Sequence, residues 1–218
     1  MPKYLHQAAE YLPILLSGLW LTIAVTLVSL CLATVGGMFW ALLRTSGLPI
    51  LARPARVLIE FIRGIPILVI LFYIYFVMPD VGIDLSAFQA GCIGLALTYS
   101  CYIGETFRAG IEAVDVGQVE AAKSIGMKRG ITMRRVVLPQ AFTIVLPAYS
   151  NNVVMLLKDS SQVSVISVAE LSMQGKMLAS STFNNMTVFT LVALLYLCLT
   201  IPLNFLMRYA ERKFGRKV

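Results

Sequence analysis

Long stretches without charge are the feature that most limits the folds open to this chain. A helix needs about 20 apolar residues to cross the hydrocarbon core of a membrane. Of the 218 residues only 13% are charged, about half of the share that soluble domains carry. We therefore predict an all-α integral membrane protein that forms a single domain over residues 1–218. Its five transmembrane helices are expected over residues 11–43, 57–79, 85–104, 136–157 and 177–207.

Two of these predicted spans depart from an ideal crossing. The first could extend for about 50 Å, against a hydrocarbon core of about 30 Å. We therefore expect it to begin near Ser17–Gly18 and to bend or end at Gly36–Gly37. The second is long enough only if it includes Glu60 and Arg63. These two lie three residues apart on one helix face, where they are expected to pair or to reach the membrane interface.

Lys and Arg residues gather on one side of the predicted spans. Segments 44–63 and 105–135 and the tail after Met207 together hold fifteen of them. The other side holds Lys3 and Lys176, and Lys158 lies at a membrane edge. Because basic residues accumulate in cytoplasmic loops, we predict the N-terminus outside and the C-terminus in the cytoplasm. The same bias accounts for the net charge of +7 without nucleic acid as a partner.

The cysteine and histidine content argues against a metal or cofactor site. Cys31, Cys92, Cys101 and Cys198 all fall in apolar stretches without a CxxC spacing, so they are expected to be small buried hydrophobic residues. His6 is the single histidine of the chain. We therefore predict no metal, no cofactor and no covalent catalysis.

The cytoplasmic segment between spans three and four contains signals for a short, deliberately ended helix. Asp115 and Gln118 have the spacing of a capping box, and Gly126 is suited to the left-handed position after a helix. We predict a helix over residues 116–125, with Ala121 and Ala122 forming a smooth face that another protein could approach. On this pattern alone, a helix held to anionic lipid by nearby basic residues fits equally well.

This segment resembles the EAA loop of ABC importer permeases. The resemblance lies in Glu120-Ala121-Ala122, followed after three residues by Gly126 and after nine more by Val136-x-Leu138-Pro139. Further stretches resemble the polar amino-acid branch of that family: Ile59–Pro66, Glu105-x-x-Arg108-Ala109-Gly110-Ile111, Gly117-Gln118, Leu138–Phe142 and Lys158-Asp159-Ser160-Ser161.

The resemblance implies a type I ABC importer transmembrane fold in a bacterial cytoplasmic (inner) membrane. It implies that Glu120, Ala121, Ala122 and Gly126 belong to a coupling helix that docks on a separate ATPase dimer, where ATP hydrolysis takes place. It also implies a second permease subunit, identical or homologous, and an amino-acid-binding protein outside the membrane. The expected substrate is a polar amino acid, with basic ones included, or a close analogue.

A polar stripe on the fourth predicted span is the candidate substrate site. At helical spacing, one face carries Ala148, Asn152, Met155 and Asp159. A carboxylate at membrane depth is rare and usually functional. We therefore predict that Asp159, Asn152, Met155 and the adjacent Ser160 contact the substrate. The resemblance implies that Asp159 meets the substrate's amino group.

Structural roles remain open for the same polar residues. Asp159 would then cap the helix or pair with Lys158, and Asn152 would hydrogen-bond to a neighbouring helix. Glu105 and Arg108, three residues apart where span three leaves the membrane, favour a structural ion pair over a part in gating.

Two other functions fit the sequence less well. A non-transporting signalling or scaffold partner of an ATPase would keep the EAA loop but would need no intramembrane carboxylate. A proton-driven secondary transporter usually has more spans and inverted repeats.

The uncharged run Ser160–Ala169 is too short to span and is expected to be re-entrant or interfacial.

Overall fold

The computed structural model describes the backbone of residues 2–215 and the side chains of residues 6–215, and within that range the structure is helical without strands. In chain order, the helices are α1 (Pro2–Thr45), α2 (Pro49–Arg63), α3 (Ile67–Phe72), the π-helix η1 (Tyr73–Val77), the 3₁₀-helix η2 (Met78–Val81), α4 (Ala87–Glu112), α5 (Val116–Ser124), α6 (Arg129–Thr132), the π-helix η3 (Met133–Val137), α7 (Leu138–Asp159), the 3₁₀-helix η4 (Ser160–Ile166), α8 (Leu171–Thr182) and α9 (Asn185–Phe214).

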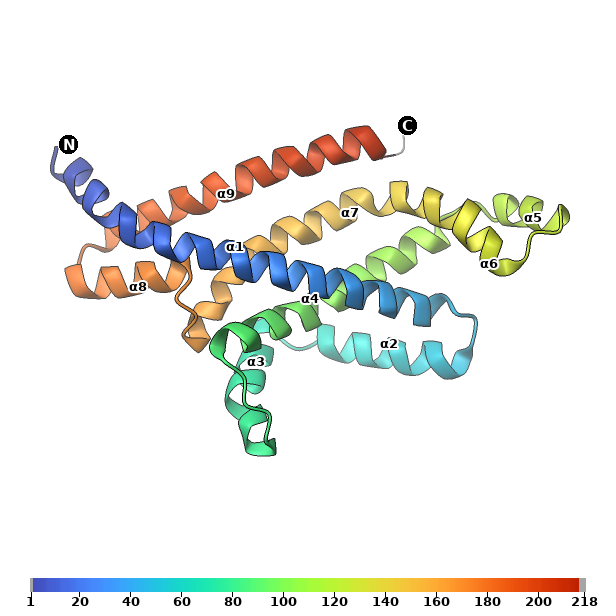
Figure 1. Cartoon of the computed structure of the whole chain (residues 1–218), viewed down its shortest axis with the longest axis horizontal. Coiled ribbons are helices and arrows are strands. Elements are labelled where there is room, and N and C mark those ends of the chain that lie inside the picture. Colours follow the sequence, from blue (N-terminus) through green and yellow to red (C-terminus); the bar gives the residue numbers. More distant parts are fainter. Residues whose placement is uncertain (1, 216–218) are drawn as a thin grey trace.

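The longest helices run along the long axis of the molecule and pack against one another (Figure 1). α4 lies between α1 and α7, and α7 also contacts α9. α8 and the start of α1 lie at one end, while α5 and α6 lie at the other end, and α3 projects sideways from the bundle (Figure 1). The predicted all-α membrane fold is confirmed.

α1 does not end at Gly36–Gly37, because it is one continuous helix through both glycines. These glycines instead let α1 and α4 approach closely. A Cβ atom on Gly37 would lie 2.7 Å from Cγ2 of Ile103, and one on Gly104 would lie 2.8 Å from Cβ of Trp40. Small residues at a crossing are how membrane helices gain close van der Waals contact.

α1 also runs through Ser17–Gly18, so the helix begins before the predicted start of the crossing, which stays a prediction. Here too the glycine serves a close contact. A Cβ on Gly18 would lie 2.9 Å from backbone atoms of Glu170 and Leu171, at the start of α8. The glycines of α1 therefore mark where other helices meet it.

The second predicted span, residues 57–79, is not one straight helix. α2 ends at Arg63 and α3 begins at Ile67, and the two directions differ by 98°. Pro66 lacks an N–H group and disfavours a helical conformation at the residue before it, which explains the break. By length and composition, three helical stretches could cross a membrane, at 6–45, 129–166 and 185–214, or four if the bent pair counts as one. The count of five spans stays a prediction.

The segment after α7 also differs from the simple span pattern. The run predicted to be re-entrant or interfacial forms η4, which continues directly from α7 and is largely buried. The predicted fifth span, starting at residue 177, begins later. Residues up to Thr182 belong to α8, Phe183 adopts a left-handed conformation at φ 53°, and α9 starts at Asn185.

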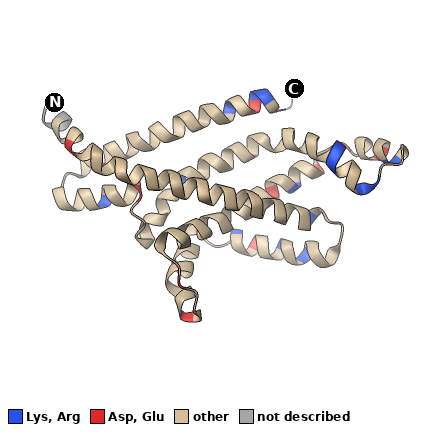
Figure 2. Cartoon of the chain, viewed as in Figure 1, with Lys and Arg blue, Asp and Glu red and all other residues tan. Residues whose placement is uncertain are grey.

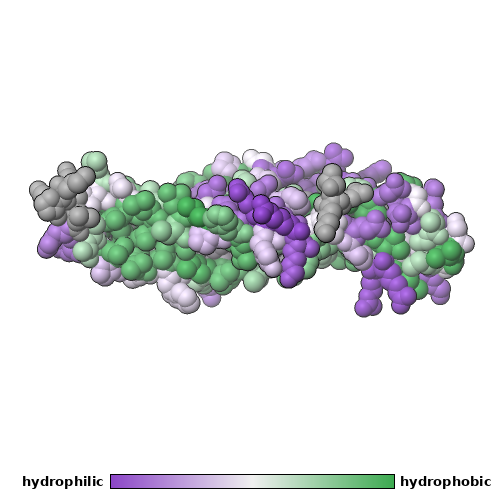
Figure 3. Space-filling view, turned by 90° about the horizontal axis from the view of Figure 1, so that it is seen from above, coloured by the Kyte–Doolittle hydropathy of each residue, from purple (hydrophilic) through white to green (hydrophobic). Residues whose placement is uncertain are grey.

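The surface separates into apolar and polar parts. Seen from above, hydrophobic residues cover much of the part toward α8, and polar residues cover the part toward α5 and α6 (Figure 3). Lys and Arg residues lie near α5 and α6 and at the end of α9 (Figure 2). Cys92 and Cys101 are buried as predicted, but Cys31 and Cys198 are exposed on helix surfaces, so that prediction is wrong for two of the four.

Candidate functional site

α5 matches the short helix predicted for the cytoplasmic segment. The Asp115 carboxylate accepts a hydrogen bond from the Gly117 N–H at 2.6 Å. At the other end, Gly126 has φ 79°, its N–H donates to Lys123 O, and the Met127 N–H donates to Ala122 O. This is the Schellman arrangement of a helix end. The reciprocal bond expected from the Gln118 side chain is absent from the described residues, so the capping box is incomplete.

The two alanines of α5 do not form one outer face. Ala122 is 4% exposed and points into the chain together with the half-buried Val119, whereas Ala121 is exposed. Consecutive helical residues point about 100° apart, so one alanine anchors the helix and the other reaches its surface. Val119 packs on a small apolar cluster that includes Val137 of η3. The prediction that Ala121 and Ala122 form one smooth outer face is therefore wrong.

The carboxylate of Asp159 is linked to α4. Its Oδ2 accepts a hydrogen bond from the Tyr99 hydroxyl at 2.6 Å, and the side chain is half-buried. Lys158 is exposed and forms no ion pair with Asp159 among the described residues. Pairing with Lys158, one of the structural alternatives, is therefore not seen.

The other predicted substrate residues lie in three different environments. Asn152 is half-buried and donates from Nδ2 to the Thr106 hydroxyl at 3.1 Å, as the structural alternative expected. Met155 is 51% exposed on the outer side of α7. Ser160 is fully buried, and its hydroxyl donates to the Leu157 carbonyl at 2.7 Å. In this conformation a ligand can reach Met155 and Asn152 more readily than Ser160.

Sequence reasoning missed the polar stripe on the facing helix. Tyr99, Tyr102 and Thr106 follow one another on α4 at spacings of three and four, so they share a face. Two of them bond to Asp159 and Asn152 of α7. The same periodicity argument that revealed the stripe on the fourth predicted span could have found this one.

A cavity of about 570 Å³ lies between these two stripes. Polar residues from three helices line it: Arg63 of α2, Tyr102, Glu105, Thr106 and Arg108 of α4, and Asn152 of α7. Asp159 lies outside this lining, two helical turns from Asn152. The candidate pathway therefore has a large cavity beside Asn152, lined by polar and apolar residues in equal number, and a separate carboxylate at Asp159.

A network of charges surrounds Glu105 at one end of that cavity. Its Oε1 lies 2.7 Å from Arg44 Nη1, and its Oε2 lies 2.9 Å from Arg108 Nη2. Arg108 also contacts Glu112. The hydrogen bond with Glu105 raises the pKa of the Arg108 guanidinium above its ordinary value, so this arginine stays charged. The predicted Glu105–Arg108 pair is present and also ties α4 to α1.

The predicted Glu60–Arg63 pair is wrong. Glu60 pairs with Arg56, at 2.7 Å between Oε1 and Nε, on the exposed side of α2. The guanidinium carbon of Arg63 lies 4.9 Å from the centre of the Tyr102 ring. Arg63 therefore turns toward α4 and the cavity.

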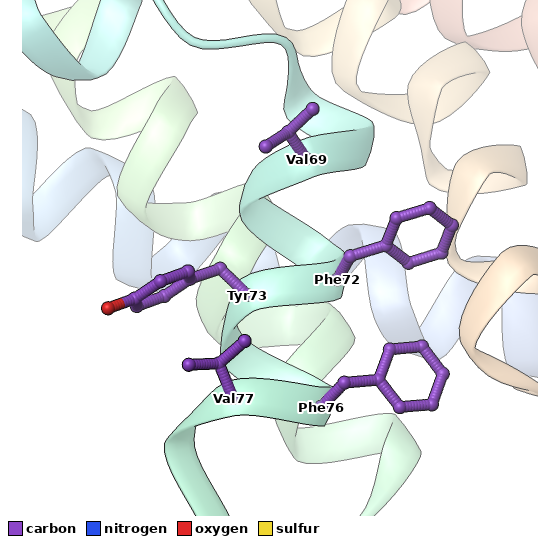
Figure 4. Close-up of a pocket in the computed structure, with 5 residues that line it drawn as sticks. All are labelled: Val69, Phe72, Tyr73, Phe76 and Val77. Carbon is purple, nitrogen blue, oxygen red and sulfur yellow. The ribbon is translucent and has the colours of Figure 1, made fainter.

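A second hollow, on α3 and η1, has a different character. Val69, Phe72, Tyr73, Phe76 and Val77 line about 340 Å³, and the side chains point outward from the helix (Figure 4). Apart from the Tyr73 hydroxyl this lining is apolar, so it offers little to a polar ligand.

Comparison with known proteins gives a consistent family. The model of the binding-protein-dependent transport system inner membrane component family matches residues 33–216. A probable amino-acid ABC transporter permease of Sinorhizobium fredii is 41% identical, covering 94% of this chain and 88% of the relative. YckA of Bacillus subtilis, described in the same words, is 39% identical, with 97% and 93% covered. The glutamine transport system permease GlnP of Escherichia coli is 34% identical, with 93% of each covered.

Solved structures agree with the sequence relatives. A structure described as an amino acid ABC transporter with histidines superposes with a TM-score of 0.88 at 38% identity, covering 94% of this chain and 96% of that one. The MetNI methionine ABC transporter, at 23% identity and a TM-score of 0.79, shares the fold. The chain therefore belongs to the binding-protein-dependent transport system inner membrane component family, as a multi-pass type I permease of the polar amino-acid ABC transporters.

Proposed function

We propose that this chain forms half of an ATP-driven pathway that imports a polar amino acid, or a close analogue, across a bacterial cytoplasmic membrane. The observation that carries the proposal is α5, a helix closed by defined hydrogen bonds at both ends and lying far from α8 (Figure 1). Because α5 is internally braced and packs on η3 through Val119, a partner that moved α5 would also move η3 and α7, which continues from it.

The outer face of α5 suits close contact with an ATPase subunit. Gly117, Ala121 and Ser124 are exposed at spacings of four and three, which leaves one side of the helix without bulky groups. At its two ends, Val116 and Ile125 are 68% and 78% exposed. Large apolar side chains this exposed, beside basic residues, favour a protein partner that covers them.

The four proposed coupling residues then have separate tasks. Glu120 and Ala121 contact the ATPase, Ala122 anchors α5 to the chain, and Gly126 ends the helix. A bulky residue at Ala121 is expected to block docking, whereas one at Ala122 would disturb the packing of the permease itself.

The charge distribution supports the proposed orientation. The α1–α2 connection, α5, α6 and the C-terminal end of α9 lie toward one end of the molecule (Figure 1). Residues 44–63, residues 105–135 and the residues after Met207, which include those segments, hold fifteen of the eighteen Lys and Arg residues. By the positive-inside rule this end faces the cytoplasm, which puts the N-terminus outside and leaves the α8 end for a binding protein.

For the substrate we propose that Asp159 meets an amino group and that Asn152 and Met155 line the route beyond it. Ser160, fully buried, supports the turn from α7 into η4. The Asp159 carboxylate makes a single hydrogen bond among the described residues. A carboxylate has about four acceptor sites, so capacity for an ammonium group remains.

Reconstitution tests the function as a whole. The permease would be placed in lipid vesicles with its ATPase and binding protein, and ATP turnover would be measured with arginine, lysine, histidine, glutamine and cystine. At least one of these is expected to stimulate turnover and to accumulate inside. No stimulation and no uptake with the whole panel would contradict the proposal.

A variant on α5 tests the coupling surface. Ala121→Trp is expected to abolish co-purification of the ATPase while the permease still inserts and folds. Ser180→Trp, an exposed small residue changed on α8, is the matched control and should leave ATPase binding unaltered. Normal ATPase binding by the Ala121 variant would show that α5 is not the docking helix.

A further inference from the structure

Arg63 differs from the other arginines around the cavity. Arg44 and Arg108 pair with Glu105, and Arg56 pairs with Glu60. Within the described residues, the Arg63 side chain is in no ion pair and no hydrogen bond. Its guanidinium instead lies over the Tyr102 ring. Among the described residues it is therefore an exposed positive charge without a paired anion.

The way in which Arg63 is held leaves its hydrogen-bond donors available. A cation–π contact is made by the charge of the guanidinium and does not use up its N–H donors, and no hydrogen bond engages these donors among the described residues. Two of these N–H groups can donate to the two oxygens of one carboxylate at the same time. Tyr102 therefore orients Arg63 without occupying the groups that would bind an anion.

The volume beside Arg63 fits a small molecule. Arg63 lines the cavity of about 570 Å³ and also an adjoining one of about 280 Å³. Ligand pockets typically measure about 300–1,000 Å³. An amino acid and several water molecules fit into this space.

The other polar groups of the cavity limit which ligands can bind in it. Glu105 is already engaged by two arginines, so it offers little to an incoming cation. Asn152 uses Nδ2 for Thr106, which leaves Oδ1 as an acceptor. Among the described residues that line it, the cavity thus presents Arg63 as a cation outside any ion pair and Asn152 Oδ1 and the Tyr102 hydroxyl as neutral acceptors, which suits a carboxylate with an ammonium group close by.

We propose that Arg63 and Asn152 form an inner subsite for the amino acid after it leaves Asp159, in which Arg63 donates to the α-carboxylate and Asn152 Oδ1 accepts from the ammonium group. This inference rests on the proposed transport function. Asn152 and Asp159 share one face of α7, seven residues or about 10 Å apart along the helix. The pathway therefore has a negative group at one end and a positive group at the other. A zwitterion is held first by its ammonium group and then by its carboxylate.

The test compares ligands with and without the carboxylate. The purified permease–ATPase complex, without binding protein, would be titrated calorimetrically with arginine, lysine, histidine and glutamine, each as the free acid and as its α-carboxamide. The free acid of the transported amino acid should bind at least about tenfold more tightly than its amide, the scale of a lost charge-assisted hydrogen bond. Equal binding of acid and amide to the parental complex would overturn the subsite.

Substitutions assign that preference to Arg63. Arg63→Gln should remove it, and Arg63→Lys should keep part of it. Arg56→Gln is the matched control, since Arg56 is also an exposed arginine of α2 but is paired with Glu60, and it should keep the full preference. An assembled, ATP-hydrolysing Arg63→Gln complex that still prefers the acid tenfold would overturn the proposal.

A measurement on the unaltered protein covers the case in which Arg63→Gln does not assemble. Phenylglyoxal modifies accessible arginines, and mass spectrometry follows Arg63 and Arg56 separately. The free acid should slow modification of Arg63 and leave Arg56 unaffected, while the amide should protect neither. Absence of protection at Arg63 would overturn the subsite. If vesicles still show substrate-stimulated ATP turnover, the proposed function stands while the subsite falls.

Discussion

Asp159 and Glu170 are carboxylates eleven residues apart whose surroundings are opposite. Glu170 has no exposed surface. Its carboxylate accepts from the Tyr196 hydroxyl at 2.7 Å, the Met173 N–H at 3.0 Å and the Thr22 hydroxyl at 3.2 Å. Asp159 is half-buried and accepts one hydrogen bond, from Tyr99.

The difference separates a structural carboxylate from one that is open to a ligand. The partners of Glu170 come from α1, α8 and α9, so this residue joins three helices at one point. Asp159 joins α7 to α4 by a single bond and keeps acceptor capacity free. Burial of a charged group is tolerated when its hydrogen bonds are complete, and free capacity at membrane depth calls for a partner or water. Four substitutions test this contrast.

Glu170→Leu is expected to have the largest effect. It removes the acceptor that three donors share and leaves Thr22 with only the Gly18 carbonyl and Tyr196 with only Ser172, and a buried group that loses its partner costs about 1–3 kcal/mol. We expect loss of most folded permease, measured as a monodisperse peak and thermal unfolding in detergent. Glu10→Leu, at an exposed glutamate on α1, is the control and should unfold at the parental temperature. Parental stability of the Glu170 variant would remove its structural role.

Asp159→Asn is expected to abolish function while leaving the fold intact. The substitution keeps the shape and the bond from Tyr99 but removes the charge that would hold an ammonium group. Substrate-stimulated ATP turnover and uptake should fall by an amount equivalent to about 1.5–3 kcal/mol, with ATPase binding unchanged. A well-assembled variant with parental substrate dependence would show that Asp159 is structural, as Glu170 is.

Local signals explain what the sequence revealed about these regions. The helix α5 and its ends at Asp115 and Gly126 could be predicted, because the hydrogen bonds that close those ends join residues no more than five positions apart. Asp159 was recognised because helical spacing placed it in line with Asn152. Features of this kind depend on neighbours in the chain, which a single sequence displays.

Partners distant in sequence explain what was missed. Glu170 looked unremarkable because Thr22 lies 148 positions away, and Tyr99 is 60 positions from Asp159. The glycines at Gly36–Gly37 suggested a bend because their contact with α4 cannot be read from α1. Which donor meets which carboxylate is determined by how the helices pack.

Tyr196→Phe is expected to weaken the Glu170 junction without destroying it. The change removes one donor and leaves the two others in place, so the cost should be about 1–2 kcal/mol. It should appear as a lower unfolding temperature, and substrate-stimulated turnover per folded molecule should remain parental. A transport defect at parental stability would mean that the Glu170 cluster takes part in the transport cycle.

Tyr99→Phe is the corresponding change at Asp159 and is expected to have the smallest effect. The half-buried carboxylate can accept water in place of the hydroxyl, so the unfolding temperature should fall less than for Tyr196→Phe. Because Tyr99 occupies an acceptor position that an ammonium group would use, its removal should lower the amino-acid concentration that half-stimulates ATP turnover, by up to a fewfold. If transport instead fell as far as with Asp159→Asn, Tyr99 would be holding the carboxylate in its working position, and the single bond at Asp159 would matter as much as the three at Glu170.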